Sequence, residues 1–156
     1  AEGGSTLYFA NLLDIIGKGK VISIDINRDN FKVNHKRIIM ITGDSSSEET
    51  VTKVSNLCRN QTVLVVHDGG HSKEQVLKDL EAYSSLVSIN SYFIVEDGVI
   101  DLFRPTEEIG CFFFFRDGPF VAVKEFLRKN RNFVVDKQKE RYILTYNPNG
   151  FLKRIS

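Results

Sequence analysis

The sequence has little of what disulfide-rich, membrane-spanning or nucleic-acid-binding proteins need. Its two cysteines, Cys58 and Cys111, lie far apart without metal-ligand spacing, so we expect no disulfide framework and a reducing cytoplasm. No apolar stretch approaches the roughly 18 residues of a membrane-spanning helix, and the first residues do not have the pattern of a signal peptide. Positive and negative side chains are interspersed to a net charge of +1, which predicts no nucleic-acid partner.

The remaining composition is that of an ordinary globular domain. The chain has 156 residues, of which 42% are apolar and 26% charged. Short β-rich segments alternate with helical ones. The predicted strands are 20–26, 38–42, 62–67 and 91–95, with a closing pair at 133–135 and 142–146. Such alternation predicts a doubly wound α/β fold with a mostly parallel sheet that helices cover on both faces.

Capping signals locate the predicted helices. The helices begin at Ser5, at a capping box of Ser46 and Glu49, at a second box of Ser72 and Gln75, and at Pro119. The segment 98–118 is long for a plain connection, so we expect a functional loop or a partly disordered one.

A glycine pair opens the chain, where no strand can precede it. In doubly wound sheets a loop of this kind follows the central first strand, and here it is Gly3-Gly4. We therefore expect that residues 1–156 form one domain that lacks its first strand and is truncated at its N-terminus.

The same segment has features of a nucleotide site. Glycine lets a ligand approach the backbone closely, next to the N-terminus of a helix. Asp25 follows Gly4 by about twenty residues, the spacing of the acid that binds ribose hydroxyls in nucleotide-binding α/β domains. A dinucleotide cofactor is also compatible with this pattern.

Acidic residues follow four successive predicted strands. They are Asp25, Asp44, Asp68 and the pair Glu96-Asp97. Ligands of open α/β sheets bind outside the carboxyl ends of the strands. Because aspartate also favours loops and helix caps, one such acid indicates little. Four at one edge of the sheet favour a binding site.

Three of these acids indicate a metal site. Asp68, Glu96 and Asp97 close two neighbouring strands, and such carboxylates repel one another unless a cation or protons are present. An all-oxygen ligand set suits Mg²⁺. The alternative is purely structural: Asp68 caps a helix and Glu96-Asp97-Gly98 forms a turn.

Histidines near these acids offer a proton acceptor. His71 lies three residues after Asp68, where a neutral imidazole could accept a substrate proton, although it could equally line the loop. His67 is interpreted as a core residue. An iron site of two histidines and one carboxylate is a further reading, but the adjacent His67 and Asp68 point to opposite faces of a strand.

Four consecutive aromatic residues occupy Phe112 to Phe115. They cannot all face one core. A hydrophobic lid, an oligomer contact, part of a substrate pocket and a buried strand all remain open.

Several segments resemble one family. They are EGGSTLYFANLL, GKVISIDI, the GDSSS turn, VVHDGGHSKEQVLKDLEAYSSLVSINSYFIVED and LTYNPNGFLKRI, which together cover nearly the whole chain. The chain resembles the cephalosporin hydroxylase family, which also covers rhamnosyl O-methyltransferase-like proteins. The resemblance implies a Rossmann-like fold of the class I methyltransferases that use S-adenosylmethionine. The family is also similar, more remotely, to catechol-type O-methyltransferases.

The resemblance also implies roles for individual residues. Asp68, Glu96 and Asp97 would hold Mg²⁺ or another divalent cation. The cofactor-binding residues would be Gly3, Gly4 and Ser5 at the methionine part of S-adenosylmethionine, Asp25 at the ribose, and Gly43, Asp44 and Ser45 beside the adenine.

Catechol-type enzymes have a lysine base three residues after the first metal acid, and His71 occupies that position here. The resemblance therefore implies metal-assisted O-methylation of a hydroxyl on a small molecule, sugar or glycolipid, with a homo-oligomer left open. An iron-dependent hydroxylase and a non-catalytic nucleotide-binding module are the alternatives.

Overall fold

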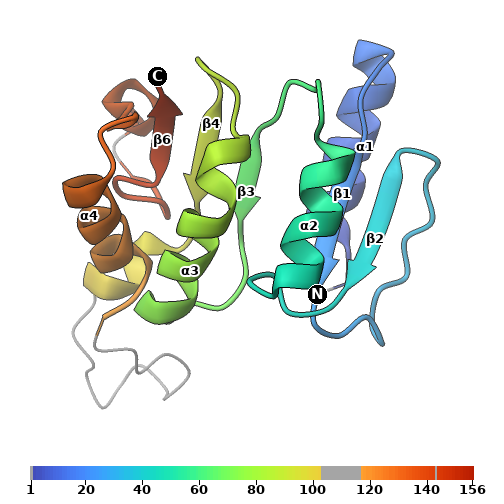
Figure 1. The fold of residues 1–156 in the computed structure, drawn as a ribbon, viewed down its shortest axis with the longest axis horizontal. Helices are drawn as coiled ribbons and strands as arrows, with labels where there is room; N and C mark the ends of the chain where they lie inside the picture. Colours follow the sequence, from blue (N-terminus) through green and yellow to red (C-terminus); the bar gives the residue numbers. More distant parts are fainter. Residues whose placement is uncertain (1, 103–116, 143) are drawn as a thin grey trace. The chain divides into compact units, whose positions relative to one another are not determined.

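The structure, a computed structural model, describes residues 2–102, 117–142 and 144–156. The chain divides into two compact units, residues 1–57 (unit 1) and 58–156 (unit 2), and each is described by itself. Helices and strands alternate along most of the chain (Figure 1). None of the helices in these described ranges is both long enough and apolar enough to cross a membrane.

Unit 1 is a parallel strand pair with two helices. It comprises α1 (Gly4–Ile16), β1 (Val21–Asp25), β2 (Ile38–Thr42) and α2 (Glu48–Leu57). The two strands pair in parallel with Asp25 opposite Thr42, so their carboxyl ends coincide. Helix α1 contacts both strands (Figure 1). Gly17 ends α1 at a φ of +85°, in the left-handed conformation that glycine readily adopts.

Two predicted helix starts in unit 1 are wrong by one or two residues. Gly3, not Ser5, is the N-cap of α1, and no side chain caps it. Gly3 has a φ of +93°, and a Cβ there would lie 2.6 Å from the Phe31 ring, so glycine fits for steric reasons. At α2 the cap is Ser47, whose Oγ accepts from the Thr50 N–H at 3.3 Å. Ser46 instead donates to Asp44, which explains the displacement.

Unit 2 is a mixed four-stranded sheet with two long helices. Its strands are β3 (Val65–His67), β4 (Tyr92–Val95), β5 (Phe133–Val135) and β6 (Phe151–Arg154), in the spatial order β3-β4-β6-β5. Strands β3 and β4 are parallel, and β6 runs antiparallel to both β4 and β5. The helices are α3 (Lys73–Tyr83) and α4 (Pro119–Lys129), with short 3-10 turns η1 (Ser84–Leu86), η2 (Gly98–Leu102) and η3 (Lys137–Glu140).

The helices of unit 2 pack against each other and supply much of its core (Figure 1). The Ser72 side chain accepts from the Gln75 N–H at 3.2 Å, and Pro119 occupies the first turn of α4, so both predicted starts are confirmed. Buried apolar side chains come from both helices and from the sheet: Val76, Leu80, Ala122, Val123, Phe126, Phe93, Val95, Phe133 and Leu152. The burial of these apolar side chains stabilises the sheet, and with it the ends of β3 and β4, after which the acids come.

The closing strand predicted at 142–146 is wrong. The described residues of that segment are not in a strand, and β5 pairs instead with β6. Leu152 of β6 is fully buried, whereas Leu144 is 87% exposed. Alternation of apolar and polar residues cannot separate the two segments, because burial against β4 and β5 decides between them. Of the long segment 98–118, η2 is observed, while Phe112 to Phe115 lie outside the described residues.

Candidate metal and cofactor sites

The acids predicted to bind a metal follow two paired strands of unit 2. His67 at the end of β3 is in register with Val95 at the end of β4. The backbone N–H of Glu96 donates to the His67 carbonyl at 3.0 Å, so the pairing continues past the strands. Asp68 and Glu96 therefore leave neighbouring strands at the same edge of the sheet.

The charges of these acids act on one another. The pKa of Glu96 is raised above its usual 4.5, first by burial and then by the negative charges of Asp68 and Asp97. Within residues 2–102, 117–142 and 144–156, no lysine or arginine forms an ion pair with any of the three. Within the described part of the chain, the repulsion is thus not compensated by a lysine or an arginine, and the one basic side chain in an ion pair with these acids is the imidazole of His71.

The three side chains do not form a complete metal-coordination site. Among the described residues, no group of three or more His, Cys, Asp or Glu side chains is positioned to hold a metal ion. The fit is one of chemistry: three carboxylates without a lysine or arginine partner are the hard oxygen donors that Mg²⁺ prefers, and Mg²⁺ keeps several of its waters.

His71 lies beside one of these acids. Its Nε2 is 3.7 Å from Oδ2 of Asp97, an ion pair when the imidazole is protonated. The start of α4 also packs here, because a Cβ on Gly118 would lie 3.1 Å from the His71 carbonyl oxygen. The structure therefore brings His71 close to Asp97.

His67 belongs to the core, as predicted. Its side chain is buried, and its Nε2 lies 3.0 Å from Oδ2 of Asp79 on α3. The same carboxylate oxygen accepts from Nε2 of Gln75 at 3.2 Å. This pairing occupies His67 within the fold and removes one ligand from the iron site of two histidines.

Sequence reasoning missed a turn that packs under the acids. The N–H of Asp97 donates to Oδ1 of Asn147 at 3.0 Å, fifty positions further along the chain. Val95 N–H donates to the Gly150 carbonyl at 2.9 Å, beside that contact. The signal was present, since Asn-Pro-Asn-Gly is a typical turn sequence, but nothing in it shows which strand the turn meets.

A second missed residue is Asp101, in η2. Its Oδ2 accepts from the Val121 N–H at 3.0 Å, in the first turn of α4. Burial raises the pKa of Asp101, against the lowering effect of this hydrogen bond. A carboxylate distant in sequence thus caps α4, where the helix dipole favours negative charge.

The residues predicted to bind the cofactor gather at one edge of unit 1. The Gly43 N–H donates to the Asp25 carbonyl at 2.9 Å, which joins the ends of β1 and β2. Oγ1 of Thr6, in the first turn of α1, lies 3.4 Å from Oγ of Ser23 in β1, so α1 begins near that edge. A Cβ on Gly4 would have no atom within 4 Å, so the start of α1 is open to a ligand.

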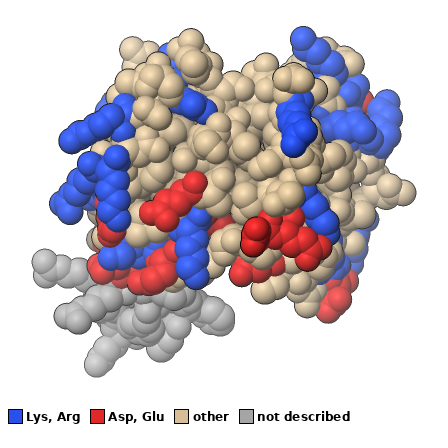
Figure 2. All heavy atoms as spheres, in the orientation of Figure 1, with Lys and Arg blue, Asp and Glu red and all other residues tan. Residues whose placement is uncertain are grey.

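Each unit thus assembles one part of the predicted site. Unit 1 holds the cofactor set, Gly3, Gly4, Ser5, Asp25, Gly43, Asp44 and Ser45, and unit 2 holds Asp68, His71, Glu96 and Asp97. On the face that Figure 2 shows, acidic and basic side chains lie in several separate groups.

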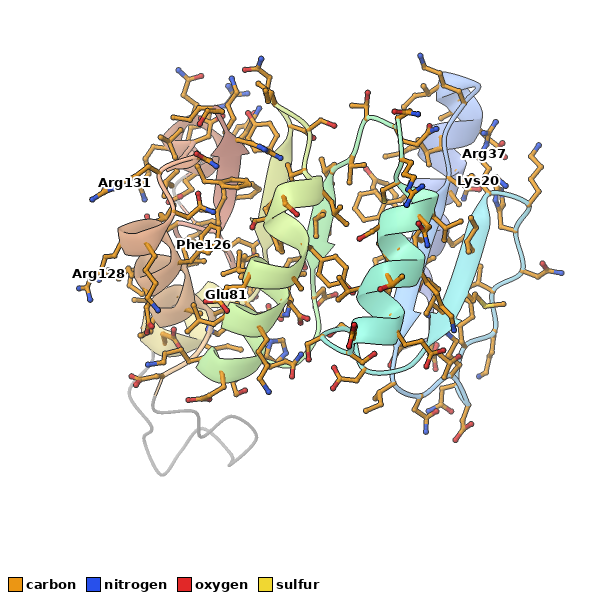
Figure 3. All side chains as sticks on the ribbon, in the orientation of Figure 1. Lys20, Arg37, Glu81, Phe126, Arg128 and Arg131 are labelled. Carbon is orange, nitrogen blue, oxygen red and sulfur yellow. The ribbon has the colours of Figure 1, made fainter. Side chains whose placement is uncertain are left out.

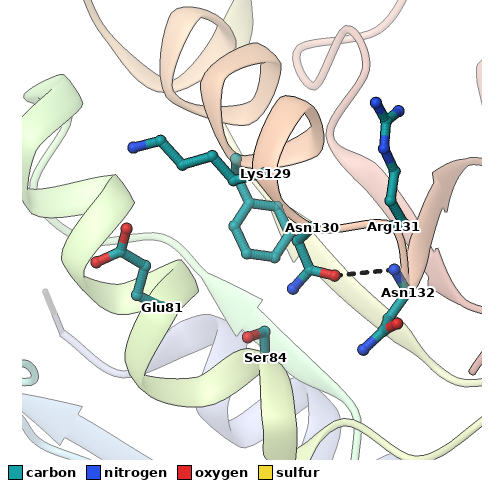
Figure 4. Close-up of a pocket in the computed structure, with 7 residues that line it drawn as sticks. Glu81, Ser84, Lys129, Asn130, Arg131 and Asn132 are labelled. Atoms are coloured by element: carbon teal, nitrogen blue, oxygen red, sulfur yellow. Dashed lines mark hydrogen bonds between the residues drawn. The ribbon is translucent and has the colours of Figure 1, made fainter.

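A pocket of about 480 Å³ lies elsewhere in unit 2. The residues that line it come from the second half of α3, from η1 and from the end of α4 with the residues that follow: Glu81, Ser84, Phe126, Lys129, Asn130, Arg131 and Asn132 (Figures 3 and 4). The pocket lies at the C-terminal ends of α3 and α4, whereas His71 and Gly118 stand just before their N-terminal ends. The pocket is therefore separate from the acidic cluster.

Comparison with known proteins identifies the family. The sequence model of the family Rhamnosyl O-methyltransferase/CmcI matches residues 1–155. The chain belongs to this family, and the resemblance to rhamnosyl O-methyltransferase-like proteins is confirmed.

Individual relatives agree with the family match. The chain is 27% identical over 160 aligned positions to a rhamnosyl O-methyltransferase of Mycobacterium leprae (strain TN), with 97% of this chain and 67% of the relative covered. It is 26% identical to one from Mycobacterium tuberculosis (strain ATCC 25618 / H37Rv), with 97% and 63% covered. The chain thus spans about two thirds of the length of these relatives.

Solved structures share the fold. A structure of cmcI with Mg and SAM aligns with a TM-score of 0.65 at 21% identity, covering 99% of this chain and 61% of that one. The MycE methyltransferase of the mycinamycin biosynthetic pathway, solved with Mg and SAH, aligns with a TM-score of 0.53 at 13% identity, covering 92% and 39%. The predicted α/β methyltransferase fold is confirmed.

Proposed function

We propose that this protein is an S-adenosylmethionine-dependent, divalent-metal-assisted O-methyltransferase that acts on a hydroxyl of a sugar-bearing acceptor. The family match and the relatives named rhamnosyl O-methyltransferase support the reaction and the sugar. The observation that carries the metal assistance is the acidic cluster at the ends of the paired strands β3 and β4, where burial and the charges of Asp68 and Asp97 raise the pKa of Glu96.

The open edge of unit 1 supports the cofactor assignment. The start of α1 presents backbone N–H groups and leaves room next to Gly4 for a ligand. Asp25 and the Gly43-Asp44-Ser45 turn lie at the ends of paired strands, where nucleosides bind in this fold class. We assign Gly3, Gly4 and Ser5 to the methionine part, Asp25 to the ribose and the turn to the adenine.

The acidic cluster of unit 2 would hold the metal through Asp68, Glu96 and Asp97. A divalent cation, when bound, lowers the pKa of a nearby hydroxyl and stabilises the oxyanion that forms. The carboxylates of the chain would fix the position of that charge, and the burial of Glu96 strengthens their field.

His71 would accept the proton of the acceptor hydroxyl. In the transfer, the acceptor oxygen bonds to the methyl carbon, the methyl–sulfur bond breaks, and its electron pair stays on sulfur. Asp97, 3.7 Å from His71, would stabilise the imidazolium so formed.

The test is methyl transfer by the full-length protein. The assay uses methyl-labelled S-adenosylmethionine and a rhamnose-containing glycolipid, with Mg²⁺ or with a chelator. We expect Asp68→Ala to lower kcat/KM more than about 100-fold, because a metal ligand is lost. Glu49→Ala, which removes an exposed acid paired with Lys53, is the matched control and should keep wild-type activity.

Two results would contradict the proposal. The first is methyl transfer by Asp68→Ala at the wild-type rate in the presence of chelator. The second is oxygen consumption by the wild-type protein with added iron and without S-adenosylmethionine, which would favour a hydroxylase instead.

A further inference from the structure

We propose that Asn147 is a positioning residue that fixes the backbone of Asp97 next to Glu96, at the proposed metal site. This inference rests on the proposed function, because it assumes that Asp97 is a metal ligand. It adds a residue from the far end of the chain to a site built from the tips of β3 and β4.

The backbone of Asp97 has an unusual conformation. Its φ is +59°, in the left-handed region that residues with a side chain adopt uncommonly, aspartate more readily than most. A contact to the backbone N–H favours this conformation over the right-handed one. The N–H of Asp97 donates to Oδ1 of Asn147 at 3.0 Å, and this contact is the direct candidate for that role.

Backbone contacts on both sides place Asn147 accurately. The N–H of Val95 donates to the Gly150 carbonyl at 2.9 Å, and that of Val99 donates to the Tyr146 carbonyl at 3.0 Å. Three alternate residues, 95, 97 and 99, therefore all donate to the segment 146–150. The middle bond alone uses an acceptor from a side chain, so a single substitution can remove it while the flanking bonds remain.

Close packing limits how far this turn can move. A Cβ on Gly98 would lie 3.2 Å from the Pro148 carbonyl oxygen. Oγ1 of Thr145 accepts from the Asn147 N–H at 3.0 Å, and Oε1 of Glu140 accepts from the Asn149 N–H at 3.0 Å. Asn147 thus stands on a turn that is held from both sides.

Loss of the Asn147 acceptor would release Asp97. Its N–H would have to find water, and the backbone could relax toward a right-handed conformation, which would swing the carboxylate away from Glu96. Removing partners that orient metal ligands typically weakens metal affinity by 10–100-fold.

The test is calorimetric titration of the full-length protein with Mn²⁺, with the metal-free melting temperature measured alongside. We expect Asn147→Ala to raise the Mn²⁺ Kd about tenfold. Asn147→Asp keeps an acceptor oxygen at the same reach and should bind within about threefold of wild type or more tightly. Asn130→Ala removes a similar contact, from the Asn132 N–H to Oδ1 of Asn130, at the other end of α4, and should leave the Kd unchanged.

Each outcome decides the question. Wild-type affinity in Asn147→Ala overturns the inference, and equal weakness of Asn147→Ala and Asn147→Asp overturns the hydrogen-bond explanation. If Asn147→Ala does not fold, Asn147→Ser, whose shorter side chain falls short of Asp97, carries the same expectation. Undiminished binding by Asp68→Ala would instead show that the proposed metal site is wrong, which separates the two failures.

Discussion

Asp14 in unit 1 and Glu96 in unit 2 are carboxylates in opposite surroundings. Asp14, on α1, lies 2.5 Å from Nε of Arg37 and 3.4 Å from Nζ of Lys36. Its pKa is lowered from 3.8, chiefly by the hydrogen bond from Arg37 (labelled in Figure 3). The pKa of Glu96 is raised, by burial and by two further carboxylates.

This difference separates an acid that stabilises the fold from the acids that we propose to bind a metal. The charge of Asp14 is matched inside unit 1 and favours folding. Burial and the charges of Asp68 and Asp97 raise the pKa of Glu96, so its ionised form disfavours folding, and a divalent cation bound there would offset this repulsion.

Removal of each acid should have different consequences for metal binding. Glu96→Ala should raise the Mn²⁺ Kd of the full-length protein more than about 100-fold, because a ligand is lost. Asp14→Ala should leave the Kd unchanged and lower the melting temperature. Calorimetric titration and thermal unfolding of both variants check this, and equal Kd values would remove the distinction.

A larger side chain in the turn 146–150, which packs against the acidic cluster, should destabilise the protein. A Cβ on Gly150 would lie 2.1 Å from the Val95 carbonyl oxygen, so Gly150→Ala must displace the backbone at the end of β4. We expect it to lower the free energy of unfolding by about 2 kcal/mol or more. The control is Gly4→Ala in unit 1, where a Cβ meets open space; similar urea midpoints for the two variants would contradict this packing.

The smallest effects concern pH, and their signs differ. The lowered pKa of Asp14 means that its stabilising contribution is present above pH 3.8 and lost as the pH falls through the lowered value. The raised pKa of Glu96 means that the contribution of this side chain to stability is most favourable below pH 4.5 and falls as the pH rises through the raised value.

Metal-free protein should therefore respond oppositely to two neutralising substitutions. Near pH 7 we expect Asp14→Asn to lower the melting temperature and Glu96→Gln to raise it slightly, by about 1–2 °C. The Glu96→Gln difference should shrink as the pH falls through the raised pKa of Glu96 toward 4.5, whereas the Asp14→Asn difference should persist at pH 4 and shrink only below pH 3.8. Melting curves in chelator across this range check the signs, and a stabilising Asp14→Asn would reverse the argument.

Much of the fold could be predicted because its signals are local. The strands β2 and β4 each consist of a run of mostly apolar residues. Ser72 and Pro119 mark helix starts by the chemistry of their own side chains. The closing strand could not be located, because burial of Leu152 rather than Leu144 depends on contacts with β4 and β5.

The candidate site was predictable in its acids but not in their support. Asp68, Glu96 and Asp97 follow strands, so topology alone brings them to one edge. Asn147 and Asp101 act on residues 50 and 20 positions away, and no periodic pattern encodes such pairings.

The most direct test of the central claim is an anomalous-scattering map from crystals of the full-length protein soaked with Mn²⁺. The account predicts one strong peak in contact with carboxylate oxygens of Asp68, Glu96 and Asp97. A map with no peak there, or with manganese bound only at other acids, would contradict it.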